Sequence, residues 1–263
     1  MNDINVTRSR LFKLRTSFSD INFKQVNHIQ ELQKSSQLLC KNYQKKGYVA
    51  SGCEFLYLPQ YLIRSNFLFV AKKNEDIVGT IGIVCDEKLP VYTSFSTEIE
   101  TLQLKKGKCV EIGSLAICPE YQNQNLFYDL YVSAVFYAIF KLRAQHIFIQ
   151  IDSKKTSFYE RLFFQKVGES KMLSEYNGSI SSLLYMDVAH AWKLMRLYCD
   201  GHCNVQVIRN MLKLLDVYER YKFLSACPLH DASSLWSEQE MKAYKNLCGY
   251  PSISKLETVT VRN

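Results

Sequence analysis

The sequence predicts an α/β (α+β) fold, in which one mixed β-sheet is flanked by helices and followed by a helical appendage. Strand-like and helix-like hydrophobic patterns alternate over most of the chain. Hairpin connections occur beside helical crossovers, a combination that is typical of a mixed sheet. After Ala189 the pattern is helical only. We therefore expect a main domain over residues 1–189 and a helical C-terminal extension over residues 190–263.

The first third predicts a strand, a helix and a hairpin. "RLFKLRT" alternates apolar and basic residues, as an edge strand does. "SD" at residues 19–20 offers a helix N-cap, and apolar residues then recur at helical spacing from Val26 until Gly47. "FLFVAKK" and "DIVGTIGIVCD" are β-rich runs, and the "NE" between them predicts a hairpin.

The rest of the main domain alternates helices with strands. Three further helices are expected in "PVYTSFSTEIETLQLKKG", from about Leu126 to Leu142, and in "KTSFYERLF". Four further strands are expected in "KCVEIGSLAIC", "HIFIQID", "QKVGE" and "SSLLYMDV". The predicted order is therefore β-α-β-β-α-β-α-β-α-β-β.

The C-terminal extension predicts three helices, in "AHAWKLMRLYC", "VQVIRNMLKLLDVYERYKFL" and "SEQEMKAYKN". In the last of these, Ser237 and Glu240 have the spacing of a capping box. Cysteine and histidine also gather here, at Cys199, His202, Cys203, Cys227 and His230. The helix expected between the two groups would separate them by roughly 35 Å. Each group alone offers too few ligands for a closed zinc site, so we expect no metal.

Composition indicates a soluble, cytoplasmic protein with one large core. The chain has 263 residues, of which 47% are hydrophobic. No run reaches the ~18 apolar residues needed for a transmembrane helix, and no apolar block of signal-peptide type stands at the N-terminus. The nine cysteines are scattered, several inside apolar strand patterns. Such cysteines are typical of small buried side chains in a reducing compartment.

Positive charge is concentrated near the N-terminus. Residues 1–75 carry 12 Lys and Arg against 5 Asp and Glu, whereas residues 76–263 carry 21 against 20. A basic third of this kind suits an acidic partner: nucleic acid, an anionic membrane or an acidic carrier protein. Solvated lysines on exposed faces are the plainer interpretation.

Two segments resemble the GNAT-type acyltransferases. "FYERLFFQKVGE" (residues 158–169) looks like the late helix-to-strand motif of that family. "EIGSLAICPEYQNQNLF" (residues 111–127) looks like its central strand and donor-binding loop. In that family the loop reads Arg or Gln, then two residues of any type, Gly, one residue of any type, and Gly or Ala. The specified positions correspond here to Gln122, Asn125 and Phe127, so only the first of them is kept. The resemblance implies a GNAT-like sheet, mixed but mostly antiparallel, between flanking helices.

A closer resemblance covers roughly residues 25–170. "KNYQKKGYV", "GTIGIVCDEKLP" and "STEIETLQLKKGKCVEIGSLAI" look like the long-chain N-acyl amino acid synthases, which are related to the acyl-homoserine-lactone synthases. This resemblance implies a fatty acyl donor held as a 4'-phosphopantetheine thioester on an acyl carrier protein, or as acyl-CoA, with no tightly bound cofactor. It implies a small amine or amino-acid acceptor and no nucleic acid; any membrane contact would be peripheral. Gly113 and Ser114 stand where these relatives carry Ser and Arg.

Acyl transfer to an amine needs a base and an acid. Glu111 is the candidate base, because apolar neighbours along its strand would desolvate the carboxylate and raise its pKa. The alternative is an exposed Glu111 at the sheet edge, or one paired with a lysine. Tyr159 is the candidate acid for the leaving sulfur, as the matching tyrosine is in many GNAT enzymes. Ordinary core packing is the alternative for Tyr159.

The turn between the central strand and the long helix is the candidate donor site. Free backbone N–H groups at a helix start attract a phosphate whatever the side chains are. We expect the donor to contact two short stretches: Leu115, Ala116 and Ile117 on the strand, and Gln122, Asn123, Gln124, Asn125, Leu126 and Phe127 in the turn. A turn without glycine is bulkier and suits one phosphate better than the pyrophosphate of coenzyme A. A capped helix start without a ligand is the alternative.

Aromatic residues that could line an acyl-chain tunnel are Phe136, Tyr137, Phe140, Phe148 and Phe158, although ordinary core packing accounts for them equally well. Three functions are compatible with these observations. The first is an N-acyltransferase that uses acyl carrier protein. The second is a GNAT N-acetyltransferase that uses coenzyme A, and the third is a catalytically silent GNAT-like binding module.

Overall fold

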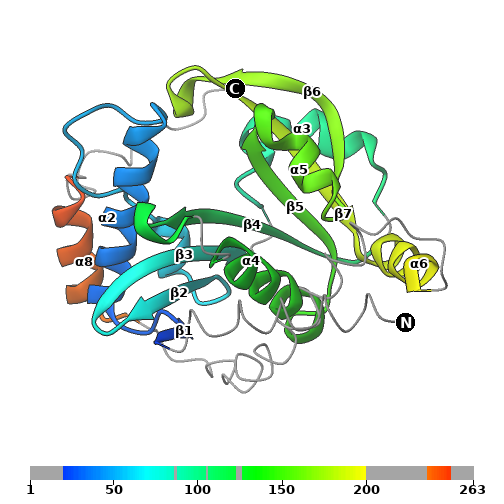
Figure 1. Cartoon of the computed structure of the whole chain (residues 1–263). Coiled ribbons are helices and arrows are strands. Elements are labelled where there is room, and N and C mark those ends of the chain that lie inside the picture. Colours follow the sequence, from blue (N-terminus) through cyan, green and yellow to red (C-terminus); the bar gives the residue numbers. More distant parts are fainter. Residues whose placement is uncertain (1–19, 86–87, 105, 123–125, 200–235, 250–263) are drawn as a thin grey trace.

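A seven-stranded sheet forms the centre of the protein (Figure 1). The computed structural model describes residues 20–85, 88–104, 106–122, 126–199 and 236–249. The strands lie in the order β1-β2-β3-β4-β5-β7-β6. They are β1 Ile21–Gln25, β2 Phe67–Lys73, β3 Asp76–Val84, β4 Lys108–Ile117, β5 Ala144–Asp152, β6 Gln165–Leu173 and β7 Ser179–Asp187.

Every neighbouring pair of strands is antiparallel except β4 and β5. The parallel pair arises because the chain crosses from β4 to β5 through a helix rather than a hairpin. The prediction of a mixed, mostly antiparallel sheet is therefore confirmed.

Helices cover both faces of the sheet (Figure 1). The helices are α2 Ile29–Lys45, α3 Tyr92–Thr101, α4 Leu126–Phe136, α5 Thr156–Glu160, α6 Val188–Cys199 and α8 Glu238–Leu247. Alternate strand residues divide between two cores, as the period of a strand requires. Phe67 and Phe69 pack on the side of α4 and α6, whereas Leu68 and Val70 pack on the side of α2, α3 and α8.

The predicted order of elements is confirmed for the middle of the chain, but the predicted start of the first helix, just after residues 19–20, was wrong. Residues 21–25 form β1, an edge strand that pairs with β2, and α2 begins only at Ile29. Residues 21–25 form a strand because they pair with β2, so α2 does not begin after residues 19–20. The strand expected in "RLFKLRT", the middle helix of the extension and the histidines of both Cys–His groups lie outside the described residues.

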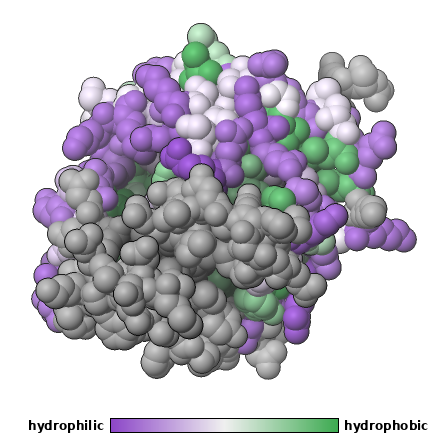
Figure 2. Space-filling model, turned by 45° about the vertical axis from the view of Figure 1, so that its right-hand side comes forward, coloured by the Kyte–Doolittle hydropathy of each residue, from purple (hydrophilic) through white to green (hydrophobic). Residues whose placement is uncertain are grey.

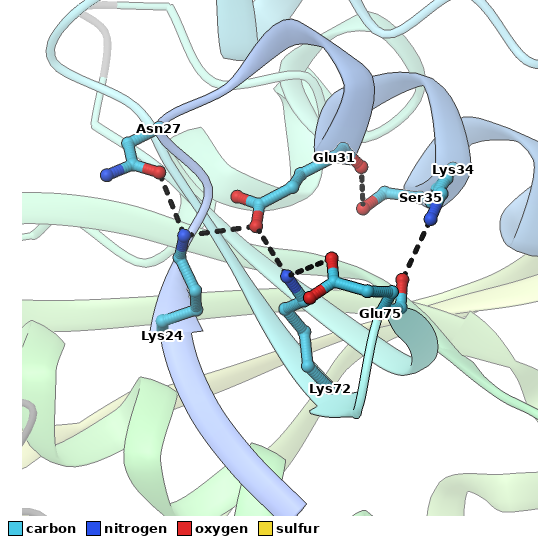
Figure 3. Close-up of polar contacts among 7 residues, drawn as sticks. All are labelled: Lys24, Asn27, Glu31, Lys34, Ser35, Lys72 and Glu75. Atoms are coloured by element: carbon cyan, nitrogen blue, oxygen red, sulfur yellow. Dashed lines mark hydrogen bonds and ion pairs between the residues drawn. The ribbon is translucent and has the colours of Figure 1, made fainter.

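A buried glutamate joins α2 to the edge of the sheet (Figure 3). Oε1 of Glu31 lies 3.0 Å from Nζ of Lys24 on β1 and 3.2 Å from Nζ of Lys72 on β2. Lys72 also pairs with the exposed Glu75 at 3.5 Å. Burial raises the pKa of Glu31, but the two ammonium groups more than offset this and hold the pKa below its ordinary value.

Helix α8 packs against α2 and is part of the same core (Figure 1). Its predicted capping box is confirmed, since Ser237 and Glu240 bond reciprocally at its start. Tyr244 is fully buried and its hydroxyl donates to the carbonyl of Leu56 at 3.1 Å. The boundary at residues 189/190 stays a prediction.

Hydrophilic residues dominate the described part of the face drawn in Figure 2, and apolar residues appear there in separate patches. Across the described ranges, no helix combines the length and the hydropathy needed to cross a bilayer.

Candidate active site

Strands β4 and β5 separate halfway along their length and leave a cavity. Their pairing runs from Lys108 to Glu111 on β4 and ends where Glu111 meets Phe148. Beyond that point residues 112–115 and 149–152 line a cavity of about 150 Å³ instead of pairing with each other. The two strand edges that face this gap are free to bond an extended ligand.

A β-bulge in β4 shapes one wall of this cavity. Thr80 pairs with Ala116 and Gly82 with Gly113, so Ser114 and Leu115 together lie opposite the single residue between Thr80 and Gly82. Ser114 has a positive φ of 51°, a conformation that costs energy outside glycine. The Thr80 hydroxyl donates to the carbonyl of Ser114 at 2.8 Å, which holds the bulge in place. Gly113 keeps the cavity wall open, because a Cβ there would meet no atom within 4 Å.

Tyr61 fixes the same bulge from the other side. Its ring is 3% exposed, and its hydroxyl donates to Oγ of Ser114 at 2.9 Å. The ring lies over Gly82, where an added Cβ would come within 1.7 Å of the Tyr61 hydroxyl. The indole N–H of Trp236 donates to the carbonyl of Tyr61 at 3.1 Å. The segment that leads into α8 therefore supports the residue that holds the bulge.

Glu111 is buried directly beside the cavity. Its side chain is 9% exposed, and its Oε2 accepts the backbone N–H of Val91 at 2.8 Å. Burial raises the pKa of Glu111 to about 7, although the Val91 hydrogen bond opposes the shift. Among the described residues no lysine forms an ion pair with it. The carboxyl group is therefore poised to exchange a proton near neutral pH.

A group of tyrosines lies near Glu111 at one side of the cavity. Tyr43 lines the cavity, whereas Glu111 does not. Burial raises the pKa of the Tyr43 phenol, and the nearby charges of Tyr176 and Glu111 add to the shift. The rings of Tyr43, Tyr48 and Tyr176 meet edge to face at 5.7 to 6.4 Å. Tyr43 therefore lies at the cavity and within electrostatic reach of Glu111.

The opposite side of the cavity carries two further phenols. Tyr159 on α5 and Tyr131 on α4 both line it, and their ring centroids are 6.0 Å apart. Burial raises the pKa of the Tyr159 hydroxyl above its ordinary value, so it is protonated at neutral pH. The Tyr159 ring also packs against Phe127 and Phe164. The structure thus places Tyr159 at the cavity and in the core packing at once.

The expected donor-contacting residues divide between several environments. Leu115 lines the cavity, while Ala116 and Ile117 are buried on opposite faces of β4. Gln122 turns back and donates its amide N–H to the carbonyl of Ile117 at 3.1 Å. Leu126 is buried at the start of α4, and Phe127 stacks on Tyr131. Asn123, Gln124 and Asn125 lie outside the described residues.

Charged groups gather where the cavity meets α2 and α5. Lys46, Asp152 and Lys155 all line it. Desolvation and the positive charge of Lys155 lower the pKa of Lys46, and Asp152 acts against this shift. Tyr48 donates to Oδ2 of Asp152 at 3.1 Å, so the carboxylate is partly engaged. Two cations and one carboxylate therefore face the cavity.

Sequence reasoning missed most of the cavity lining. The missed residues that face it include Tyr43, Lys46, Tyr48, Ile81, Tyr131, Asp152 and Lys155, and Tyr61 supports it from behind. Tyr43, Lys46 and Tyr48 stand in "KNYQKKGYV", a segment that carried the resemblance. The resemblance of that segment to the family was the sequence signal that could have identified these three residues as cavity-lining.

Comparisons with known proteins identify a matching family and a shared fold. Residues 34–187 match the family model FeeM, described as N-acyl amino acid synthase FeeM. The structure of FeeM, an N-acyl amino acid synthase from uncultured soil microbes, superposes with a TM-score of 0.57 at 18% identity, over 64% of this chain and 92% of that one. An acyl-CoA N-acyltransferase from Pseudomonas aeruginosa has a TM-score of 0.44 at 14% identity, over 64% of this chain and 98% of that one.

No curated protein sequence matches the chain. The family match nevertheless spans more than half of the 263 residues, and the FeeM structure shares the fold. The chain is therefore an acyltransferase with a GNAT-type fold, and it belongs to the FeeM family of N-acyl amino acid synthases.

Proposed function

We propose that the protein transfers a long-chain fatty acyl group from the 4'-phosphopantetheine arm of an acyl carrier protein to the amine of an amino acid. The observation that carries this proposal is the cavity between β4 and β5, with Tyr159 on one side and Glu111 beside the other. A pantetheine arm is narrow and rich in amides, so it suits a gap between two unpaired strand edges. Gly113 leaves room for it to pass.

The reaction requires one new C–N bond and the loss of one C–S bond. The acceptor ammonium first gives a proton to Glu111 through a bridging water, and the free amine attacks the thioester carbonyl carbon. The nitrogen of the adduct then loses its surplus proton to solvent. The C–S bond breaks, and the departing thiolate takes a proton from Tyr159. Solvent then restores the proton of Tyr159 and accepts the proton held by Glu111, so both residues return to their starting states.

An amino-acid acceptor also brings a carboxylate, which needs a cation. Lys46 and Lys155 face the cavity at the side where Tyr43 and Tyr48 lie. The two lysines would bind the acceptor carboxylate and leave its amine directed toward Glu111. They would thus supply the positive charge that Gly113 and Ser114, in place of Ser and Arg, do not.

The basic N-terminal third would dock the acidic carrier protein. Described lysines of this region include Lys34, Lys41, Lys45 and Lys46 on or next to α2. Affinity for acyl carrier protein should then fall several-fold as salt rises from 50 to 500 mM, because screening shortens the range of the attraction. A carrier affinity that is flat with salt would contradict this docking.

The reaction class can be tested by mass spectrometry. Extracts from cells that express the protein should contain an N-acyl amino acid, and this product should disappear with Glu111→Gln. In purified form the wild type should use dodecanoyl carrier protein well and dodecanoyl-CoA poorly. Efficient use of acetyl-CoA would instead favour a coenzyme-A-dependent acetyltransferase. No turnover of any thioester would favour a binding module.

A further inference from the structure

Tyr131 carries a buried hydroxyl without a hydrogen-bond partner in the described part of the chain. The residue lies in the middle of α4 and is 3% exposed. An unpaired buried hydroxyl costs roughly 1–3 kcal/mol, and native proteins rarely leave one without a reason. Tyr131 also lines the cavity between β4 and β5, so a small shift of its side chain would present this hydroxyl to a ligand in that cavity.

A second cavity begins at the same side chain. It has a volume of about 40 Å³ and is lined by apolar groups, which include Val135 and Ile139 near the end of α4, Met186 on β7 and Trp192 on α6. Tyr131 lines this cavity as well as the first. A molecule with a polar head in one cavity and an alkyl tail in the other would pass directly along Tyr131.

The geometry of α4 changes beside this junction. Residues 137–141 form a π-helical turn, and Ile139 lines the apolar cavity from within it. Turns of this type widen a helix and occur frequently at functional sites. The widened turn therefore lies next to the apolar cavity that begins at Tyr131.

The Tyr131 ring is held firmly. Its centroid lies 5.6 Å from that of Phe127 in a stacked arrangement, and 6.3 Å from that of Phe164. Tyr159 lies on a further side at 6.0 Å. A hydroxyl on a ring packed in this way has few alternative positions, so it loses little freedom when it donates a hydrogen bond to a ligand.

We propose that Tyr131 contacts the substrate: its hydroxyl donates a hydrogen bond to the carbonyl oxygen of the acyl thioester, and its ring directs the alkyl chain into the apolar cavity beyond. This inference rests on the proposed acyl transfer. The carbonyl oxygen becomes an oxyanion when the amine attacks, so the hydrogen bond strengthens in the transition state. Tyr131 and Tyr159 then have separate tasks, at the carbonyl oxygen and at the leaving sulfur.

The test compares Tyr131→Phe with a control on the same helix. Tyr137 also carries a buried hydroxyl, but its ring packs on Phe67 and Phe69 and it lines neither cavity. With S-dodecanoyl-N-acetylcysteamine as donor, Tyr131→Phe should lower kcat about 100-fold, the usual effect of losing one oxyanion donor. Tyr137→Phe should stay within about threefold of wild type, since the group it loses is remote from the reacting atoms.

Two further measurements separate a substrate contact from a structural role. Thermal unfolding of Tyr131→Phe should match wild type or exceed it, because the variant removes an unpaired buried hydroxyl. Ala191 is buried in the apolar cavity lining, so Ala191→Leu should fill that cavity. Its ratio of kcat/KM for dodecanoyl over hexanoyl donor should fall about tenfold.

The outcomes distinguish this inference from the proposed function. Full activity of Tyr131→Phe with every donor, in a wild type that turns over, would overturn the role of Tyr131 and leave acyl transfer intact. If the wild type turns over no thioester, calorimetry with an unreactive ketone analogue of dodecanoyl pantetheine decides instead. Equal binding to wild type and Tyr131→Phe would overturn the inference; binding at least tenfold weaker to the variant would support it.

Discussion

The hydroxyl of Tyr61 donates a hydrogen bond to Oγ of Ser114 at 2.9 Å and so joins the 3₁₀ turn Pro59–Leu62 to the bulge of β4. Ser114 holds a positive φ at that bulge, and the bulge lies where β4 departs from β5. One contact across 53 residues of sequence thus stabilises the wall of the cavity.

Tyr61→Phe should lower kcat more than it lowers stability. The variant keeps the ring over Gly82 and loses one hydrogen bond, so the free energy of unfolding should fall by about 1 kcal/mol. A less restrained bulge should reduce kcat about tenfold, because a small misplacement of reacting groups is costly. Ser114→Ala should have the same effect, and the double variant should be no worse than either single one. Additive losses in kcat would contradict a shared role.

Two glycines of the site should respond in opposite ways to a methyl group. Gly82→Ala should lower the free energy of unfolding by about 2 kcal/mol or more, because the new Cβ collides with Tyr61. Gly113→Ala meets no neighbour, so its stability should equal that of wild type. Its KM for the acyl donor should nevertheless rise, since Gly113 lines the cavity and the methyl group would occupy open space there. Urea unfolding and steady-state kinetics check both, and an unchanged donor KM for Gly113→Ala would count against the donor path.

Lys46→Met should raise KM for an amino-acid acceptor about tenfold and leave KM for the acyl donor unchanged. The reason is the loss of one of two cations that face the cavity. Lys45→Met is the matched control, because Lys45 is exposed on α2 and does not line the cavity. An equal change of acceptor KM in both variants would indicate general charge rather than carboxylate binding.

Glu31→Gln should destabilise the protein by about 1–3 kcal/mol at pH 7, because two lysines lose a buried charged partner. The folded-state pKa of Glu31 is depressed, so this stabilisation is present above the unfolded-state pKa and is lost as the pH falls through the folded one. The difference in urea unfolding between wild type and variant should therefore shrink in acid. Glu75→Gln, on a side chain that is 90% exposed, should cost less than about 0.5 kcal/mol.

The sheet was predictable because its signal is local. The alternation in β2, β3 and β4 fixes which residues face each core, and period-two patterns read that directly. The edge strand β1 was not predicted, because "INFKQ" is short and forms a strand through its pairing with β2. That pairing leaves no local pattern in the sequence. The bulge in β4 could not be predicted either, because a positive φ at a serine has no sequence signature.

The candidate site was predictable only where family motifs point to it. Glu111 and Tyr159 stand in motifs that carried the resemblance, and both lie at or beside the cavity. Tyr131 stands in an apolar helix, where a hydroxyl looks like any other aromatic residue. Its missing hydrogen bond and its place between two cavities are properties of the packed structure alone.

The role of Glu111 is tested by the dependence of kcat/KM on pH, with dodecanoyl carrier protein as donor and an amino acid as acceptor. A base must be deprotonated to act, and burial raises the pKa of Glu111 to about 7. Wild-type kcat/KM should therefore rise with pH through about 7. Glu111→Gln should be at least about 100-fold slower and should lack this limb. A Glu111→Gln variant that keeps wild-type activity and the same limb would contradict acyl transfer with Glu111 as the base.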